Sequence, residues 1–282
     1  MTNWHLLVST WDWEPSVIIG CALLLGCYAA VLRFRFQLRS LSFTAGVLLL
    51  FLALVSPIDT LADEYLFSAH MVQHILLILV VPPLLIMGIP RQLAQRLLRN
   101  SVAGRAEHVL STPLLAWMLG VGSMWLWHWP PLYNAALSHE GIHIAEHVMF
   151  LVTATIFWWP VLNPLAESRL SPLGAVVYLF GACTAHTVLA ILITFAPVGI
   201  YPAYLQPVDS LGILPLLRND WGITPRIDQQ LGGLLMWVPV CLIYLGFLLT
   251  TIIRWYSGPM GETSPIPALT FASPTVEYGH DK

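Results

Sequence analysis

Two pairs of histidines with the same spacing are the feature of this 282-residue sequence that could do chemistry. His70 and His74 form one pair, and His143 and His147 form the other. Residues four positions apart on a helix lie on one face, with Cβ atoms about 5–6 Å apart. Two imidazoles at that separation can share one metal ion, because zinc–nitrogen bonds are about 2.0–2.1 Å long. The spacing therefore predicts that each pair offers two ligands to a metal.

The composition is that of a membrane protein. Apolar residues make up 57% of the chain and charged residues only 10%, with a mean hydropathy of +0.74. Soluble domains usually carry about 25% charged residues. The net charge of −3 excludes the basic footprint of a nucleic-acid-binding protein. No two of the four cysteines form a C-x-x-C pair, so neither a disulfide framework nor a thiol redox motif is indicated.

A membrane-spanning helix needs about 20 mostly apolar residues. Seven stretches qualify, so we predict an all-α fold: a bundle of about seven transmembrane helices over residues 1–256, followed by a disordered cytoplasmic tail over residues 257–282. We expect Pro82 and Pro83 to kink the third segment. The predicted segments are 16–32, 41–55, 66–87, 113–128, 142–161, 173–195 and 230–253.

The basic residues predict the orientation. Ten of the twelve lie after the first, third, fifth and seventh segments, and positively charged loops stay in the cytoplasm. We therefore expect the N-terminus outside and the C-terminus in the cytoplasm, in a multi-pass protein of the plasma membrane of a bacterium. Tryptophans near the segment ends are interpreted as interface anchors. They are Trp11, Trp13, Trp125, Trp127, Trp129, Trp158, Trp159 and Trp255.

On this topology, eight of the ten histidines lie outside or in the outer half of the membrane. His128 closes the fourth segment and His186 lies in the sixth. Ionisable groups within a membrane are costly and usually mark function. Glu146 is therefore expected to face the bundle and to orient a histidine. The candidate metal ligands are His70, His74, His143 and His147, and His128 and His186 are further candidates.

The remaining candidates have simpler interpretations. His5, His108, His139 and His280 are interpreted as interface or hydrogen-bonding residues. Met71 and Met236 are interpreted as packing residues, and Cys183 as a small buried side chain. Imidazole suits zinc, copper, iron and nickel, and the sequence does not separate them. An outward-facing site with methionine and cysteine nearby leaves copper open.

Three other functions can be weighed. A retinal protein is excluded because the only lysine is Lys282, at the end of the chain. A membrane metalloenzyme is possible because His143, Glu146 and His147 match H-x-x-E-H, in which two histidines bind zinc and the glutamate is the general base. That function needs a third ligand and leaves the first pair unexplained.

Haem ligation in a membrane cytochrome is the third alternative, with His74 and either His147 or His186 as axial ligands. Pairs of histidines on one helix suit a small ion better, because axial haem ligands come from opposite faces. An absorption spectrum separates the two.

Three stretches also resemble a known family. They are SAHMVQHILLILVVPPLLIMGIPR over residues 68–91, WHWPPLYN over residues 127–134, and HIAEH over residues 143–147. These resemble the CtaG family of membrane-embedded cytochrome c oxidase assembly factors, which is linked to the caa-three-type oxidase. The resemblance covers about residues 40–253 and includes the seven-span layout.

The resemblance implies a role in maturation of the terminal oxidase that involves copper, and our first hypothesis is a non-enzymatic metal-binding factor. It implies oxidase subunits or other assembly factors as partners, besides the lipid bilayer. We carry over His70, His74, His143 and His147 as candidate ligands, with His128 and His186 on weaker grounds. The protein is expected to accept an ion at the outer face and pass it to a partner, or to hold a site that supports assembly.

Overall fold

The computed structural model describes residues 10–32 and 37–257, and the described residues contain helices and loops but no strand. Helices occupy all seven predicted segments. They are α2 (Pro15–Val31), α3 (Leu38–Val55), the continuous α5 (Phe67–Ile75), η1 (Leu76–Val80) and α6 (Val81–Gly88), α9 (Pro113–Trp127), α11 (Glu140–Leu162), α12 (Pro172–Phe195) and α13 (Pro225–Ser257). The predicted tail, His5 and His280 lie outside the described residues.

Five of these helices are long and apolar enough to cross a membrane. They are α3, the composite α5–η1–α6, α11, α12 and α13. A sixth span results if α8 (Ser101–Leu110) and α9, which meet at a bend of 72°, count as one. The remaining apolar helix, α2, has 17 residues. The protein is thus an all-helical, multi-pass membrane protein, while the count of seven spans and the orientation stay predictions.

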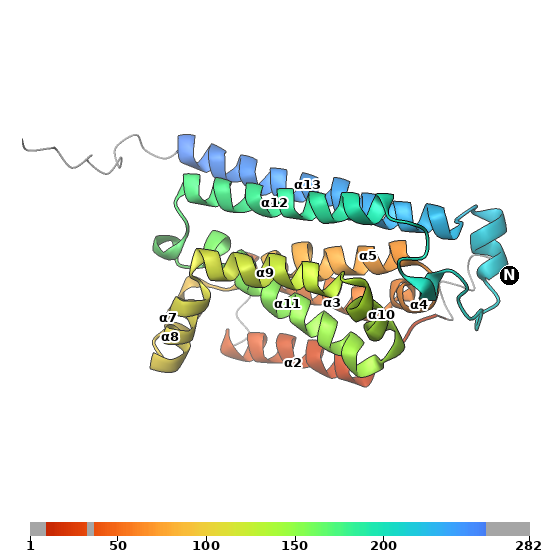
Figure 1. Cartoon of the computed structure of the whole chain (residues 1–282). Coiled ribbons are helices and arrows are strands. Elements are labelled where there is room, and N and C mark those ends of the chain that lie inside the picture. Colours follow the sequence, from red (N-terminus) through yellow and green to blue (C-terminus); the bar gives the residue numbers. More distant parts are fainter. Residues whose placement is uncertain (1–9, 33–36, 258–282) are drawn as a thin grey trace, which may run out of the picture.

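The helices run roughly parallel to one another, with short helices at both ends (Figure 1). Helices α12 and α13 lie side by side along their length, and α13 also packs on α5. Helix α11 contacts α9 and α6, and α2 packs on α3. The short α4 (Pro57–Glu64) and α10 (Pro130–Ser138) lie at one end of the bundle, and α7 (Arg91–Leu98) and α8 lie at the other.

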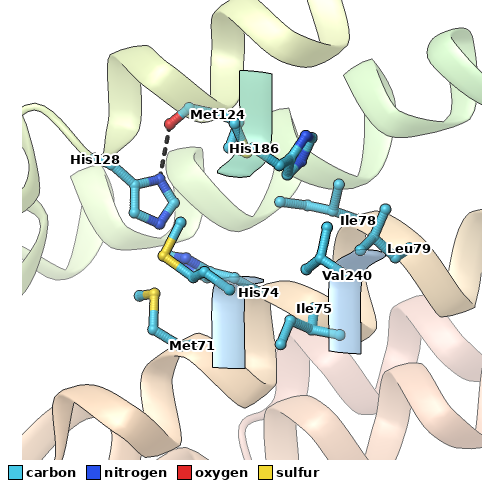
Figure 2. Close-up of a pocket in the computed structure, with 10 residues that line it drawn as sticks. Met71, His74, Ile75, Ile78, Leu79, Met124, His128, His186 and Val240 are labelled. Carbon is cyan, nitrogen blue, oxygen red and sulfur yellow. Dashed lines mark hydrogen bonds between the residues drawn. The ribbon is translucent and has the colours of Figure 1, made fainter. Parts of the chain in front are cut away.

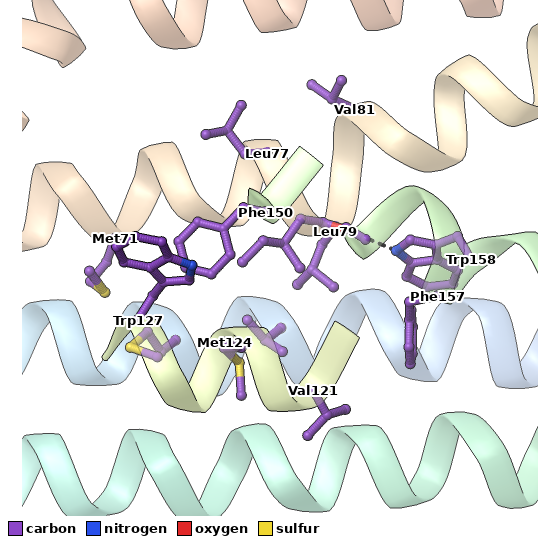
Figure 3. Packing of buried hydrophobic residues seen from close by; sticks show 14 of the residues in the cluster. Met71, Leu77, Leu79, Val81, Val121, Met124, Trp127, Phe150, Phe157 and Trp158 are labelled. Atoms are coloured by element: carbon purple, nitrogen blue, oxygen red, sulfur yellow. Dashed lines mark hydrogen bonds between the residues drawn. The ribbon is translucent and has the colours of Figure 1, made fainter. Parts of the chain in front are cut away.

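The double proline is accommodated by a π-helical turn. Pro82 has no N–H to donate to the carbonyl of Ile78, four residues earlier, and the π-helical η1 occupies this region. The indole Nε1 of Trp158 on α11 donates to that carbonyl at 3.0 Å (Figure 3). The donor that proline lacks is therefore supplied by a neighbouring helix.

Burial corrects the interpretation of two tryptophans as interface anchors. Trp158 is fully buried and Trp127 is 5% exposed, and both belong to the hydrophobic core (Figure 3). By contrast, Trp13 and Trp129 are about 60% exposed, at 63% and 59%, as residues facing lipid or its surface would be. The sequence pattern does not separate these cases, because a tryptophan near a helix end suits either environment.

Glycine sets the approach of α13 to α5. A Cβ atom on Gly232 would overlap the ring of Phe67, and one on Gly233 would overlap Thr194 of α12. The two glycines therefore allow α13 to approach both neighbours closely. This packing fixes the start of α5, the helix that carries the first histidine pair.

Candidate metal centre

The first histidine pair is positioned by a carboxylate from another helix. The first turn of α5 has free backbone N–H groups, and Leu66 at its N-cap offers no side-chain acceptor. Asp228 of α13 accepts from the N–H groups of Phe67 and Ser68 at 2.8 and 3.0 Å, and from the Ser68 hydroxyl at 2.6 Å. A carboxylate at a helix N-terminus also complements the helix dipole. Asp228 thus fixes the turn directly before His70.

The structure brings the two histidine pairs together. The ring centroid of His70 lies 5.4 Å from that of His143 and 6.0 Å from that of His147. His74 and His147 are also 6.0 Å apart. One donor atom from each of His70, His74 and His147 lies within 4.8 Å of the other two. Three imidazoles from two helices can therefore converge on one ion.

The donor atoms of this group have no hydrogen-bond partner. Nε2 of His70 and of His147, and both ring nitrogens of His74, are buried without a hydrogen bond. Buried polar atoms are almost always hydrogen-bonded, so a cluster of unpaired nitrogens needs an explanation. Zinc and copper are among the ions that imidazole binds well. The residues present fit such an ion.

A second possible group shares His70 with the first. One donor atom each from Asp63, His70 and His143 lies within 4.8 Å of the others, and Asp63 Oδ1 is 3.5 Å from His143 Nε2. Burial, followed by the negative charge of Asp59, raises the pKa of Asp63 to about 8. Sequence reasoning missed Asp63 as a ligand. The available signal was its loop, which holds three acidic residues and no basic one.

Glu146 lies inside the cluster, as its expected role requires. The residue is fully buried on α11, and its Oε1 is 3.5 Å from Nε2 of His74 on α5. Both carboxylate oxygens are without a hydrogen bond. A carboxylate here can balance the charge of an ion or of a protonated imidazole.

Tyr204 selects the tautomer of His70. The Tyr204 hydroxyl donates to the carbonyl of Ala62 at 2.9 Å and lies 3.2 Å from His70 Nδ1. Because its proton is used on Ala62, the hydroxyl accepts from Nδ1–H, and the lone pair of His70 is on Nε2. Tyr133 lies 3.1 Å from the same hydroxyl. Tyr204 comes from η3 (Pro202–Tyr204), in a loop where no spacing indicates a role.

The other candidates divide into two classes. The ring of His128 lies 5.3 Å from that of His74, and His186 reaches the same region from α12. His108 and His139 are exposed and lie outside both groups. Cys183 Sγ lies 3.2 Å from Cys241 Sγ. The sulfur of Cys183 is therefore engaged with α13.

The geometry bears on both alternative functions, a membrane metalloenzyme and a haem-binding cytochrome. The rings of His143 and His147 are 4.2 Å apart, but His147 groups with the α5 pair and His143 groups with Asp63. The H-x-x-E-H pattern is thus split between two groups. Between His74 and His186 the cavity is about 20 Å³, far below the several hundred Å³ of a cofactor pocket. A haem does not fit between these rings.

Comparison with known proteins identifies relatives. The model of a family described as "Cytochrome c oxidase caa3 assembly factor" matches residues 27–258, which include every candidate ligand. An uncharacterized protein of Mycobacterium leprae is 25% identical over 208 residues, which cover 67% of this chain and 30% of that protein. Uncharacterized proteins of Mycobacterium bovis and Mycobacterium tuberculosis are 25% identical over 206 residues, with the same coverage. The chain thus spans about 30% of the length of these relatives. No solved structure matches it.

Proposed function

This chain belongs to the family of cytochrome c oxidase caa3 assembly factors, and we propose that it serves oxidase assembly by binding a metal ion between α5 and α11. The observation that carries the proposal is the convergence of His70, His74 and His147, whose donor atoms lie within 4.8 Å of one another. Helix α5 is held for this purpose by the Asp228 cap, and His70 by Tyr204.

We propose copper as the ion, carried as cargo. Imidazole donors suit copper, and the process that the family serves supports this choice over zinc. Asp63 and His143 lie closer to the end of the bundle that carries α4 and α10. They would receive the ion first, and His70, which belongs to both groups, would pass it inward. An oxidase subunit or another assembly factor would then accept it.

The orientation belongs to the same proposal. The end with α4 and α10 would face outside and the end with α7 and α8 the cytoplasm, as the arginines predict. A reporter active only in the cytoplasm should be active when fused after Arg99 and silent when inserted near Asp63 or Asn134. The opposite pattern would overturn the outward-facing site.

The cellular test is a double variant. His74→Ala/His147→Ala should lower cytochrome c oxidase activity in cells while the protein still inserts in the membrane, because two of three converging donors are lost. His139→Ala is the matched control, since His139 is an exposed histidine at the start of α11. Normal oxidase activity in the double variant would show that these histidines are not needed for oxidase assembly.

A metalloenzyme is the second candidate, and the unpaired carboxylate of Glu146 favours it. A general base must have a free carboxylate near the metal. Glu146→Gln keeps the shape and removes the base. Loss of a hydrolytic activity with metal binding retained would support the enzyme, whereas a metal carrier should lose little more than affinity.

A further inference from the structure

The group of His70, His74 and His147 is called the histidine centre below, and His74 also lines a small cavity (Figure 2). Its volume is about 20 Å³, which is room for one water-sized occupant. Four membrane segments contribute to its wall: the continuous α5–η1–α6, α9, α12 and α13. The residues that carry donor atoms are Met71, Met124, Met236, His74, His128 and His186.

All six of these residues are in the interior. Their exposed fractions range from 0% for Met71 to 5% for His186. Three methionines and three histidines therefore line one buried cavity. Figure 2 shows the side chain of Met71 near the rings of His74 and His128. Packing alone explains one methionine in a cavity wall, but it does not explain the imidazoles that accompany all three.

Two of the imidazoles have their tautomers fixed by the backbone. His128 Nδ1 lies 2.7 Å from the carbonyl of Met124, and His186 Nδ1 lies 2.9 Å from that of Ala182. Because a carbonyl only accepts, each Nδ1 carries the proton and each Nε2 carries a lone pair. Both Nε2 atoms are buried without a hydrogen-bond partner. Metal-binding histidines are typically held in this way, with one nitrogen on a backbone carbonyl and the other on the ion.

We propose that this methionine–histidine cavity binds a soft monovalent cation, Cu(I), as a site distinct from the histidine centre. The proposal rests on the proposed function in one respect, because His74 lines the cavity and also belongs to the histidine centre. A Cu(I) ion held by His70, His74 and His147 would reach the cavity without a change of oxidation state, by keeping His74 as a ligand and exchanging the other two imidazoles for thioethers and for His128 or His186.

The ligands select the class of ion. Thioether sulfur is a soft ligand that favours Cu(I), whereas carboxylates suit harder ions. The ten residues that line the cavity include no carboxylate and no thiolate, so all its donors are neutral. The Born cost of burying an ion grows with the square of its charge, so a divalent ion costs about four times as much as a monovalent one. Asp63 and Glu146 lie at the histidine centre instead, where a divalent ion can be balanced.

The test replaces the sulfurs and keeps the volume. Met71→Leu/Met124→Leu/Met236→Leu conserves size and apolarity, and Leu–Met exchanges usually cost under about 1.5 kcal/mol each. Met118→Leu is the matched control, because Met118 is 56% exposed on α9. The full chain is purified without a histidine tag and titrated with Cu(I) against a competing chelator. A parallel titration with Zn(II) reports on the histidine centre.

The wild type and Met118→Leu should bind Cu(I) with sulfur among the ligands in the copper X-ray absorption spectrum. The triple variant should lose the sulfur signal and bind Cu(I) at least about tenfold more weakly, while Zn(II) binding is unchanged. If the triple variant does not fold, the three single Met→Leu variants are measured, and each should weaken Cu(I) binding.

Two results would overturn the proposal. One is a wild-type spectrum with nitrogen ligands alone, and the other is unchanged Cu(I) affinity in the folded Met→Leu variants. In either case, if His70→Ala/His147→Ala loses the Zn(II) binding of the wild type, the histidine centre remains supported. The converse result is also distinguishable. If the wild type binds Cu(I) through sulfur but binds no Zn(II), and if His70→Ala/His147→Ala leaves its copper unchanged, the histidine centre is refuted and the cavity is supported.

Discussion

Replacing Asp228 by alanine tests whether α13 positions the histidines of α5. The carboxylate is 1% exposed and accepts three hydrogen bonds, from the N–H groups of Phe67 and Ser68 and from the Ser68 hydroxyl. Loss of a helix cap costs about 0.5–2 kcal/mol. A buried hydroxyl left without its partner costs about a further 1–3 kcal/mol. We therefore expect Asp228→Ala to lower the free energy of unfolding by about 3 kcal/mol.

Asp228→Asn should cost less than Asp228→Ala, because its amide oxygen can still accept from Ser68, although its amide nitrogen replaces the oxygen that accepts from the Phe67 N–H and the charge is lost. Asp220→Ala is the control, since Asp220 is an exposed aspartate that precedes α13, and such surface changes usually stay within about 0.5 kcal/mol. Unfolding in mixed micelles measures stability, and Zn(II) titration measures the site. His70 follows the capped turn directly, so Zn(II) affinity should fall in the same order. Equal stability of Asp228→Ala and Asp220→Ala would refute this account of α5.

Two further predictions concern groups around the centre. Trp158→Phe removes the donor to the carbonyl of Ile78, and Pro82 has no N–H to replace it, so the variant should lower the free energy of unfolding by about 1–3 kcal/mol. The control Trp125→Phe, at a position that is 37% exposed, should change it little. Burial, with smaller contributions from nearby acidic groups, raises the pKa of Asp59 from 3.8 to about 7. The unfolded chain therefore loses this proton first, and wild-type stability should fall as pH rises from about 4 to 7, by at most about 1.4 kcal/mol per pH unit. Asp59→Asn, which can still accept from Gln73, should lack this contribution in thermal unfolding measured between pH 5 and 8; an unchanged pH profile would contradict the assigned burial.

The positions of the helices follow from the sequence for a simple physical reason. A span of about 20 apolar residues is needed to cross the hydrocarbon core, and each such stretch of this chain is a helix. The i, i+4 spacing also predicts that His70 and His74 share a face, as do His143 and His147. That the two faces meet depends on α5 packing near α11, which neither pair encodes by itself.

Other parts of the site come from contacts between residues far apart in the chain. Asp228 caps a helix that begins 161 residues earlier, and Tyr204 reaches His70 from a loop without periodicity. Local patterns carry no information about such contacts. Trp158 is different, because a double proline frees backbone carbonyls and so predicts that some buried donor must be found for them. The three methionines of the cavity lie on three helices, so only the folded chain shows that they converge.

The central claim is that imidazoles of α5 and α11 form one metal centre. Its most direct test is metal analysis of the full chain, purified in mild detergent without a histidine tag and dialysed against Zn(II) or Cu(I). The wild type and His139→Ala should retain at least one ion per chain, and His74→Ala/His147→Ala should lose the Zn(II) ion while remaining folded. A wild-type protein that retains no ion, or a folded double variant with the same Zn(II) content as the wild type, would contradict the claim.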